Sequence, residues 1–297
     1  MVVKTVAILS PGEMGAAVGK VLRESGLEVT TYLEGRSEQT RRRASECGFS
    51  IVSDLEELAG SADLILSILV PAEAERVARS VARATEASGG RPTYADCNAV
   101  SPQTACSLEP LITEAGGAFT DAGIIGGPPR EGYAPRFYTS GPGASTLAEL
   151  DGRGIEVIQV GGESGRASAI KMCYAAMTKG TTALQTALLV AAIRLGVYEE
   201  LRDDLLVSQR PAFDQIERSV KRLPSVAYRW IGEMEEIAAT FESVDVTPDF
   251  HRGAADVFRL VAGSDMGKEY GSKATGIYDA IKLLADAVDA VHPKNVV

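Results

Sequence analysis

The chain has 297 residues, of which 45% are hydrophobic and 24% are charged, values typical of a globular enzyme with one large or two ordinary domains. Its formal net charge of −10 argues against nucleic acid and anionic membranes as partners. The two histidines and four scattered cysteines form no metal-ligand spacing, so we expect no metal and reduced thiols in a cytoplasmic protein.

A strand–turn–helix pattern opens the chain. Residues 4–9 are apolar, and helical spacing then runs to Gly26. The turn between them fits the dinucleotide-binding pattern G-x-G-x-x-G, except that serine replaces the first glycine. We expect Gly12 to let the backbone approach a pyrophosphate, Gly15 to let the helix pack on the strand, and the helix N-terminus to hold the anion. The predicted cofactor contacts here are Ser10, Pro11, Gly12, Glu13, Met14 and Gly15.

The segment after the second predicted strand, 28–33, bears on cofactor choice. Glu34 stands where an acidic residue would bind a ribose 2′-hydroxyl, which would indicate NAD(H). Alternatively Arg36, Ser37 and Thr40 form a cradle for a 2′-phosphate, or Ser37 simply caps a solvated helix. We favour the phosphate interpretation, and hence NADP(H), because the sequence GRSEQTRRR gathers cations within an acidic chain.

Strands and helices then alternate as far as Val160, which predicts a mostly parallel, doubly wound sheet. The pattern of residues 63–70 predicts a fully buried strand. The carboxyl end of this strand, with Leu69 and Val70, should face the cofactor. The expected strands are 63–70, 93–99, 118–125, 136–139 and 155–160, with helices at 54–59, at 72–87 and after Pro102.

Two further strand ends carry candidate substrate contacts. Asn98 stands at the carboxyl end of the strand over 93–99, where its amide would meet the nicotinamide or the substrate; alternatively it forms a turn before Pro102. The glycine-rich turn at Gly126 and Gly127 would direct backbone amides into the same cleft. Arg130, which follows this turn, would bind an anionic substrate or brace the prolines before it.

A long helix is expected from Gly161 to Gly196, leaving one domain and forming the spine of the next. Lys171 lies on its edge, and the helical period places Tyr174 and Thr178 on the same face. In a dry environment, desolvation would lower the lysine pKa and make its amine a base. The alternative is a lysine that extends to solvent from the start of the helix.

After Gly196 the pattern is helical only. We expect helices at 198–208, 211–221, 226–241, 248–261 and 276–291, with a loop over 264–276. A helical half of this size usually buries apolar faces on a neighbour, so we expect a homodimer. The domains would be a dinucleotide-binding unit over 1–161 and a helical substrate and dimerisation unit over 162–297.

These motifs resemble the β-hydroxyacid dehydrogenase superfamily, which includes 6-phosphogluconate and 3-hydroxyisobutyrate dehydrogenases. The matching segments are SPGEMG at 10–15, GRS at 35–37, DCNAVSP at 96–102, DAGIIGG at 121–127 and GESGRASAIK at 162–171. The resemblance implies that Lys171 is the acid/base residue, in a fold whose second domain is helical and dimeric. It also implies that Arg36 meets the 2′-phosphate of NADP.

Two departures from the family pattern concern the substrate. Ile125 replaces the serine of the substrate loop, and Ala175 replaces the asparagine four residues after the catalytic lysine. We therefore predict an NADP-dependent oxidoreductase acting on a hydroxy compound or its carbonyl in a less polar pocket. An imine reductase, or a non-catalytic NADP sensor, is the alternative. His251 is expected at the surface near a helix start, or in the partner subunit's cleft.

Overall fold

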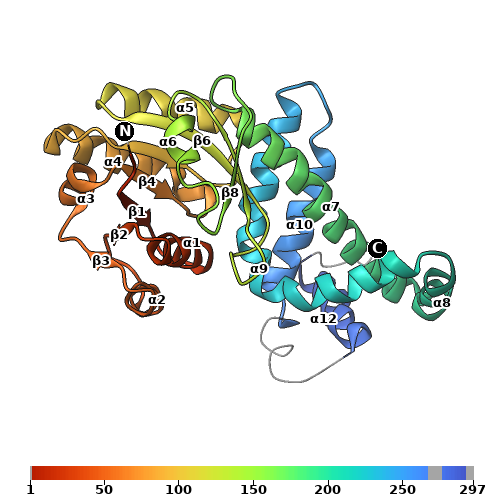
Figure 1. The fold of residues 1–297 in the computed structure, drawn as a ribbon. Helices are drawn as coiled ribbons and strands as arrows, with labels where there is room; N and C mark the ends of the chain where they lie inside the picture. Colours follow the sequence, from red (N-terminus) through yellow and green to blue (C-terminus); the bar gives the residue numbers. More distant parts are fainter. Residues whose placement is uncertain (1, 267–275, 292–297) are drawn as a thin grey trace. The chain divides into compact units, whose positions relative to one another are not determined.

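The computed structural model describes residues 2–266 and 276–291 (Figure 1). The chain divides into two compact units, residues 1–174 and 175–297, and the division falls inside a helix. The expected domain boundary after residue 161 stays a prediction. Most of the expected loop at 264–276, namely residues 267–275, and His292 lie outside the described residues.

The first unit is an α/β layer structure with a mostly parallel sheet, as predicted, and the sheet has eight strands. The strand order is β3-β2-β1-β4-β5-β6-β7-β8. Only the β6–β7 pairing is antiparallel, because a loop rather than a crossover helix joins these two strands. The strands are β1 (Thr5–Leu9), β2 (Glu28–Thr31), β3 (Ser50–Ile51), β4 (Leu64–Ser67), β5 (Thr93–Asp96), β6 (Ala118–Ile125), β7 (Arg136–Ser140) and β8 (Glu156–Gln159).

Helices cover both faces of this sheet (Figure 1). Along β1, Val6 and Ile8 join one buried cluster with α1, α2 and α6, while Ala7 and Leu9 join the other with α3, α4 and α5. This alternation is the two-residue period of a strand that is buried on both faces. The helices are α1 (Glu13–Glu24), α2 (Glu38–Glu46), α3 (Leu55–Ser61), α4 (Ala74–Ser88), α5 (Pro102–Glu114) and α6 (Ala144–Ala148), with a 3₁₀ turn η1 (Pro71–Glu73) before α4.

The long helix α7 (Arg166–Leu195) begins later than the sequence suggested. Gly161, Gly162 and Gly165 have φ values of 65°, 75° and 96°, a left-handed conformation that an α-helix excludes. The glycines therefore form a loop before the helix. At the other end, Gly196 has φ 72° and ends the helix as predicted.

The remaining helices are α8 (Tyr198–Ser208), α9 (Arg210–Glu242), α10 (Asp249–Gly263) and α12 (Ile277–Val291). The two helices expected at 211–221 and 226–241 are wrong, because α9 continues through Pro224. A proline inside a helix costs about 3 kcal/mol. Val220, Leu223, Val226 and Ala227 are all buried around it, and this continuous apolar face offsets the lost hydrogen bond.

Within residues 2–266 and 276–291, no helix is long and apolar enough to cross a membrane. The same part of the chain holds no group of three or more His, Cys, Asp or Glu side chains placed to bind a metal ion.

Candidate functional site

The turn after β1 lies where the strand order reverses, because β1 pairs with β2 on one side and β4 on the other. In sheets of this kind, ligands bind at the carboxyl ends of the strands beside that point. Ser10, at the position of the first glycine, adopts the left-handed φ of 58°. Its carbonyl accepts a 2.6 Å hydrogen bond from the Gly12 amide, so the backbone makes the tight turn that the motif requires.

The turn fits a pyrophosphate group. A Cβ on Gly15 would come within 3.2 Å of Ile8 and 3.3 Å of the Ser10 carbonyl, so this glycine allows the close helix–strand packing predicted for it. A Cβ on Gly12 would meet only the Ser10 carbonyl, at 3.9 Å. Gly12 is also the N-cap of α1, and among the described residues no side chain caps the helix there. The first-turn amides are therefore left for an anion.

The end of β2 carries both candidate ribose contacts. Glu34 accepts a hydrogen bond from the Tyr32 hydroxyl, which raises the tyrosine pKa. Arg36 is half-buried, and burial and then the charge of Arg76 lower the pKa of its guanidinium, whereas Glu73 raises it. The two guanidinium groups are thus close enough to repel each other, although Arg76 also pairs with Glu73.

Ser37 caps α2 by accepting a hydrogen bond from the Thr40 amide at 3.3 Å. The helix cap that the alternative interpretation expected at Ser37 is therefore present. This cap does not involve the Arg36 side chain, so Arg36 can still contact an anion.

Asn98 is buried and joins the ends of two neighbouring strands. Its side-chain oxygen accepts from the Leu69 amide, and its nitrogen donates to Ser67 Oγ at 3.2 Å and to Asp96. The amide thus fixes the loop after β4 that bears Leu69 and Val70. Val70 is 42% exposed, and its proposed cofactor contact stays a prediction.

The Gly126–Gly127 turn after β6 is held by Tyr133. The Tyr133 hydroxyl accepts from the Gly127 amide at 3.1 Å, and a Cβ on Gly126 would collide with this hydroxyl. The Arg130 guanidinium lies 4.3 Å from the centroid of the Tyr133 ring. Of the two roles considered for Arg130, the structure supports bracing of this turn.

Lys171 lies beside the same strand. Its ammonium donates to the carbonyl of Ile124, the penultimate residue of β6. Helix α7 can approach β6 this closely because Gly123 has no side chain. A Cβ on Gly123 would come within 2.8 Å of the Ala167 carbonyl and 2.9 Å of Lys171 Cβ. Tyr174, one turn further along α7, is 46% exposed.

Asp121 anchors the first turn of α7 to β6. Its Oδ2 accepts from Ser140 Oγ at 2.9 Å, from the Gly165 amide at 2.9 Å and from the Ser168 amide at 3.0 Å. Its Oδ1 accepts from Ser168 Oγ at 2.6 Å. A buried carboxylate at a helix N-terminus satisfies otherwise unpaired amides and complements the helix dipole, so this contact fixes the helix that bears Lys171.

The parallel strands β1, β4, β5 and β6 point the same way, and their register aligns Leu9, Ser67, Asp96 and Asp121, with β6 running four residues further to Ile125. The Ser10–Gly15 turn, Leu69, Asn98 and the Gly126–Gly127 turn follow the carboxyl ends of these strands, and the Lys171 ammonium lies at the end of β6. Thr178 belongs to the second unit, where its hydroxyl donates to the Ala175 carbonyl at 3.4 Å. Its proposed substrate contact stays a prediction.

Sequence reasoning missed three side chains of the candidate site: Asp121, Tyr133 and Arg76. Asp121 had a detectable signal, because a lone carboxylate in the buried strand AFTDAGII requires partners. Tyr133 lies only six residues after Gly127, in a loop with no regular pattern, and Arg76 is far in sequence from Arg36, so no local pattern marks either side chain.

His251 is buried rather than at the surface, with 8% of its area exposed. Its ring lies edge-on to Phe241 with centroids 4.3 Å apart. Burial explains why its pKa is lowered.

Comparison with known proteins begins with two family models. Residues 1–86 match the NADPH-binding domain of acetohydroxy acid isomeroreductase, and residues 192–261 match a domain of unknown function, DUF1932. An uncharacterised 28.5 kDa protein from Methanothermus fervidus is 29% identical over 194 residues, which are 65% of this chain and 73% of that protein.

A solved structure decides the family. It is a conserved protein of unknown function, described as structurally similar to 3-hydroxyacid dehydrogenases. It is 30% identical to this chain, with a TM-score of 0.64 over 91% of this chain and 100% of the other. The chain belongs to the β-hydroxyacid dehydrogenase-like superfamily.

Other members of known activity share the fold at lower identity. The 3-hydroxyisobutyrate dehydrogenase of Mycobacterium tuberculosis is 18% identical, with a TM-score of 0.65 over 98% of this chain and 99% of that one. An imine reductase of Myxococcus stipitatus, solved with NADP+, is also 18% identical, with a TM-score of 0.54 over 94% of this chain and 99% of that one. These two similarities concern the fold of the superfamily.

Proposed function

We propose that this protein is an NADP-dependent oxidoreductase that interconverts a small hydroxy compound, an alcohol or hydroxy acid, and its carbonyl, with Lys171 as the acid/base residue. Membership of the superfamily and the matched NADPH-binding domain support an NAD(P)-dependent oxidoreductase. The observation that carries the proposal is the position of the Lys171 ammonium at the carboxyl end of β6. The Ser10–Gly15 turn follows the carboxyl end of β1, a parallel strand of the same sheet.

The residues present fit NADP. The amides of the Ser10–Gly15 turn and of the first turn of α1 would hold the pyrophosphate. Arg36 would bind the 2′-phosphate, with Arg76 beside it, because a guanidinium matches a phosphate geometrically. The Tyr32 hydrogen bond already engages Glu34, which favours NADP(H) over NAD(H). When bound, the nicotinamide supplies the acceptor or donor of the hydride from the substrate carbon.

Lys171 accounts for the proton of the reaction. In the oxidation direction, the neutral amine would accept the substrate hydroxyl proton as the carbon–hydrogen bond breaks; in reduction, the ammonium would return it. Its hydrogen bond to the Ile124 carbonyl directs the nitrogen toward the Gly126–Gly127 turn. A positioned acid or base of this kind typically contributes about 10²–10⁴-fold to the rate.

The substrate would lie at the Gly126–Gly127 turn, with the exposed Tyr174 and Thr178 as further contacts. The Gly127 amide already donates to Tyr133, and the buried Asn98 amide is engaged by Leu69, Ser67 and Asp96, so Asn98 would shape this end of the sheet rather than bind the substrate. Ile125, at the position of the family serine, offers no hydrogen bond, and this supports a substrate that is less polar than a simple hydroxy acid.

Kinetics of Lys171→Met test the proposal. With a panel of alcohols and hydroxy acids and NADP+ as oxidant, kcat should fall by roughly 10²–10⁴-fold while the Kd for NADPH stays unchanged. The matched control is Lys20→Met, because Lys20 lies exposed on α1 with only a helical ion pair to Glu24. Wild-type turnover in the Lys171 variant would overturn the acid/base role.

The same panel separates the alternative functions. An imine reductase would reduce cyclic imines with NADPH and ignore the alcohols; the apolar Ile125 favours this outcome, whereas Lys171 opposes it. A non-catalytic sensor would bind NADPH tightly and exchange no hydride with any substrate in the panel.

We also propose a cytoplasmic homodimer that assembles through the helical unit. Exposed apolar side chains recur along α7 at Met177, Leu184, Leu188 and Leu195, with exposed fractions of 72%, 70%, 39% and 76%. Their spacing is that of a helical contact stripe. Light scattering should show a dimer for the wild type and a monomer for Leu184→Lys; a wild-type monomer would contradict the proposal.

A further inference from the structure

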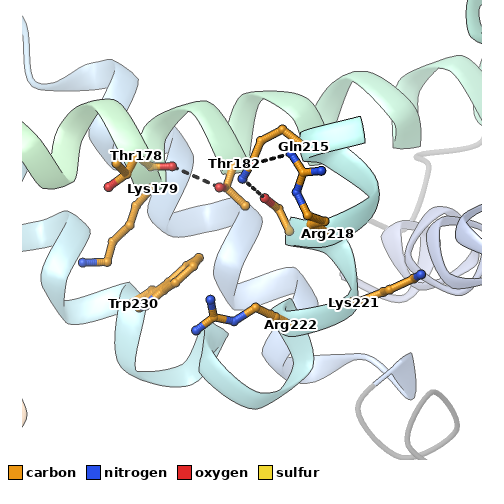
Figure 2. Close-up of a pocket in the computed structure, with 9 residues that line it drawn as sticks. Thr178, Lys179, Thr182, Gln215, Arg218, Lys221, Arg222 and Trp230 are labelled. Carbon is orange, nitrogen blue, oxygen red and sulfur yellow. Dashed lines mark hydrogen bonds between the residues drawn. The ribbon is translucent and has the colours of Figure 1, made fainter. Parts of the chain in front are cut away.

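A pocket of about 630 Å³ lies within the helical unit, between α7 and α9 (Figure 2). This volume is within the range of small-molecule sites. The lining residues from α7 are Thr178, Lys179 and Thr182, and those from α9 are Gln215, Arg218, Ser219, Lys221, Arg222 and Trp230.

The lining is cationic in an acidic chain. It contains Lys179, Arg218, Lys221 and Arg222 and no acidic residue, whereas the chain has a net charge of −10. Lys179 pairs with Glu233, so its charge is compensated. Among the described residues, neither Arg218 nor Arg222 has a carboxylate within ion-pair distance. The pocket therefore carries an uncompensated positive charge.

Trp230 gives the same pocket an aromatic surface. The Lys179 ammonium lies 5.7 Å from the centroid of the Trp230 ring. Figure 2 shows that Lys179 and Arg222 both extend toward this ring, whereas Lys221 points away from it. Both side chains are exposed, but of the two only Arg222 is directed at the ring.

Polar contacts along α9 link Arg218 to its neighbours at the exposed side of the pocket. Its guanidinium donates to Gln215 Oε1 at 3.1 Å, and Gln215 Nε2 donates to Ser219 Oγ at 3.0 Å (Figure 2). Arg218 and Arg222 are both exposed, so their guanidinium groups are accessible to an anion from solvent.

We propose that this pocket binds a small organic anion, whose phosphate or carboxylate group contacts Arg218 and Arg222 and whose apolar part lies on Trp230. Guanidinium groups bind such oxyanions through paired, charge-assisted hydrogen bonds, and a flat apolar group gains contact area on an indole face. The inference goes beyond the proposed oxidoreductase activity and uses none of the nucleotide-binding residues; the lining shares Thr178 with the proposed substrate contacts, whereas Arg218, Arg222 and Trp230 have no part in the proposed reaction.

Trp230 provides the readout, because it is the only tryptophan in the chain. The probe is phenyl phosphate, titrated into the full-length protein without NADP. We expect saturable quenching of the Trp230 fluorescence and a matching heat of binding by calorimetry. Benzoate tests a carboxylate in place of the phosphate, inorganic phosphate tests the anion alone, and benzyl alcohol tests the ring without the charge.

Substitution of the two arginines tests the anion contact. Arg218→Gln with Arg222→Gln should raise the Kd for phenyl phosphate by about tenfold or more while the melting temperature changes little. The matched control is Arg229→Gln, on the same helix but outside the lining, and its Kd should equal that of the wild type.

Three results would overturn the proposal: no saturable binding of phenyl phosphate or benzoate, equal binding of benzyl alcohol, or an equal loss in the Arg229 control. Turnover and NADPH affinity do not enter these measurements. Failure of this inference is therefore distinguishable from failure of the proposed function.

Discussion

The Asp121 carboxylate in the buried strand β6 accepts hydrogen bonds from both the backbone amide and the hydroxyl of Ser168, in the first turn of α7. Lys171 follows one turn later on the same helix. The position of the proposed acid/base residue thus depends on a strand residue that touches neither cofactor nor substrate in the proposal.

The first prediction concerns this anchor. Asp121→Asn replaces one acceptor oxygen with an NH₂ group that faces donors, and it removes the charge at the helix N-terminus. We expect a loss of roughly 2–4 kcal/mol in the free energy of unfolding, measured by urea denaturation. Ser168→Ala should cost only about 1 kcal/mol, because Oδ1 loses one donor while Oδ2 keeps its amides. Equal effects of the two variants would contradict this account.

The second prediction concerns Gly123, which allows α7 to approach β6. In Gly123→Ala, the added Cβ would meet the Ala167 carbonyl at 2.8 Å and Lys171 Cβ at 2.9 Å. The helix must move away, and a displacement of about 1 Å at a catalytic group costs on the order of 10²-fold in rate. We expect kcat to fall while the Kd for NADPH is retained.

Gly180→Ala is the matched control for this prediction. Gly180 also lies on α7, but nothing stands within 4 Å of its added Cβ. Alanine there should stabilise the helix by up to about 1 kcal/mol and leave kcat unchanged. A normal kcat in the Gly123 variant would show that the close approach does not position Lys171.

The third prediction concerns cofactor choice. Arg36→Ala should weaken NADPH binding by about tenfold or more, because it removes a charge-assisted contact to the 2′-phosphate. NADH binding should stay unchanged or improve slightly. Arg76→Ala should have a smaller effect in the same direction, because Arg76 also pairs with Glu73. Fluorescence titration with both nucleotides measures this, and equal affinities for NADH and NADPH in wild type and variant would refute the 2′-phosphate contact.

Much of the first unit could be predicted from local patterns. The buried strands, the glycine turn with Gly15 packed on Ile8, and the end of α7 at Gly196 all have short-range causes that the sequence displays. The two-residue β3 and the five-residue α6 were missed because such short elements carry no periodic signal.

Most of the errors had tertiary causes. Two helices were expected on either side of Pro224, but the buried residues around it keep α9 continuous. His251 was expected at the surface because it lies near a helix start, whereas Phe241 packs on it from another helix. The Asp121 contacts were missed because its partners Ser140, Gly165 and Ser168 are distant in sequence. The Tyr133 contact with Gly127 is local, but it lies in an irregular loop that carries no periodic signal.

The fourth prediction concerns pH and His251. Burial lowers its pKa in the folded state, and among the described residues its Nδ1 has no hydrogen-bond partner. The folded protein therefore binds a proton at this site less readily than the unfolded chain, whose histidine has a pKa of about 6.5. The contribution of neutral His251 to stability is complete above that pH and falls as the pH drops through about 6.5 toward the lowered pKa.

Urea denaturation between pH 5.5 and pH 8 measures this effect, in a range chosen to lie above the ordinary pKa of carboxyl groups. The wild type should lose stability on acidification, whereas His251→Gln should show a flatter profile even if it is less stable throughout. Comparing how steeply the free energy of unfolding changes with pH separates the effect of protonating His251 from the effect of losing its packing against Phe241. Parallel profiles in the two proteins would mean that His251 does not control the pH dependence, and that the loss of stability arises from groups elsewhere in the chain.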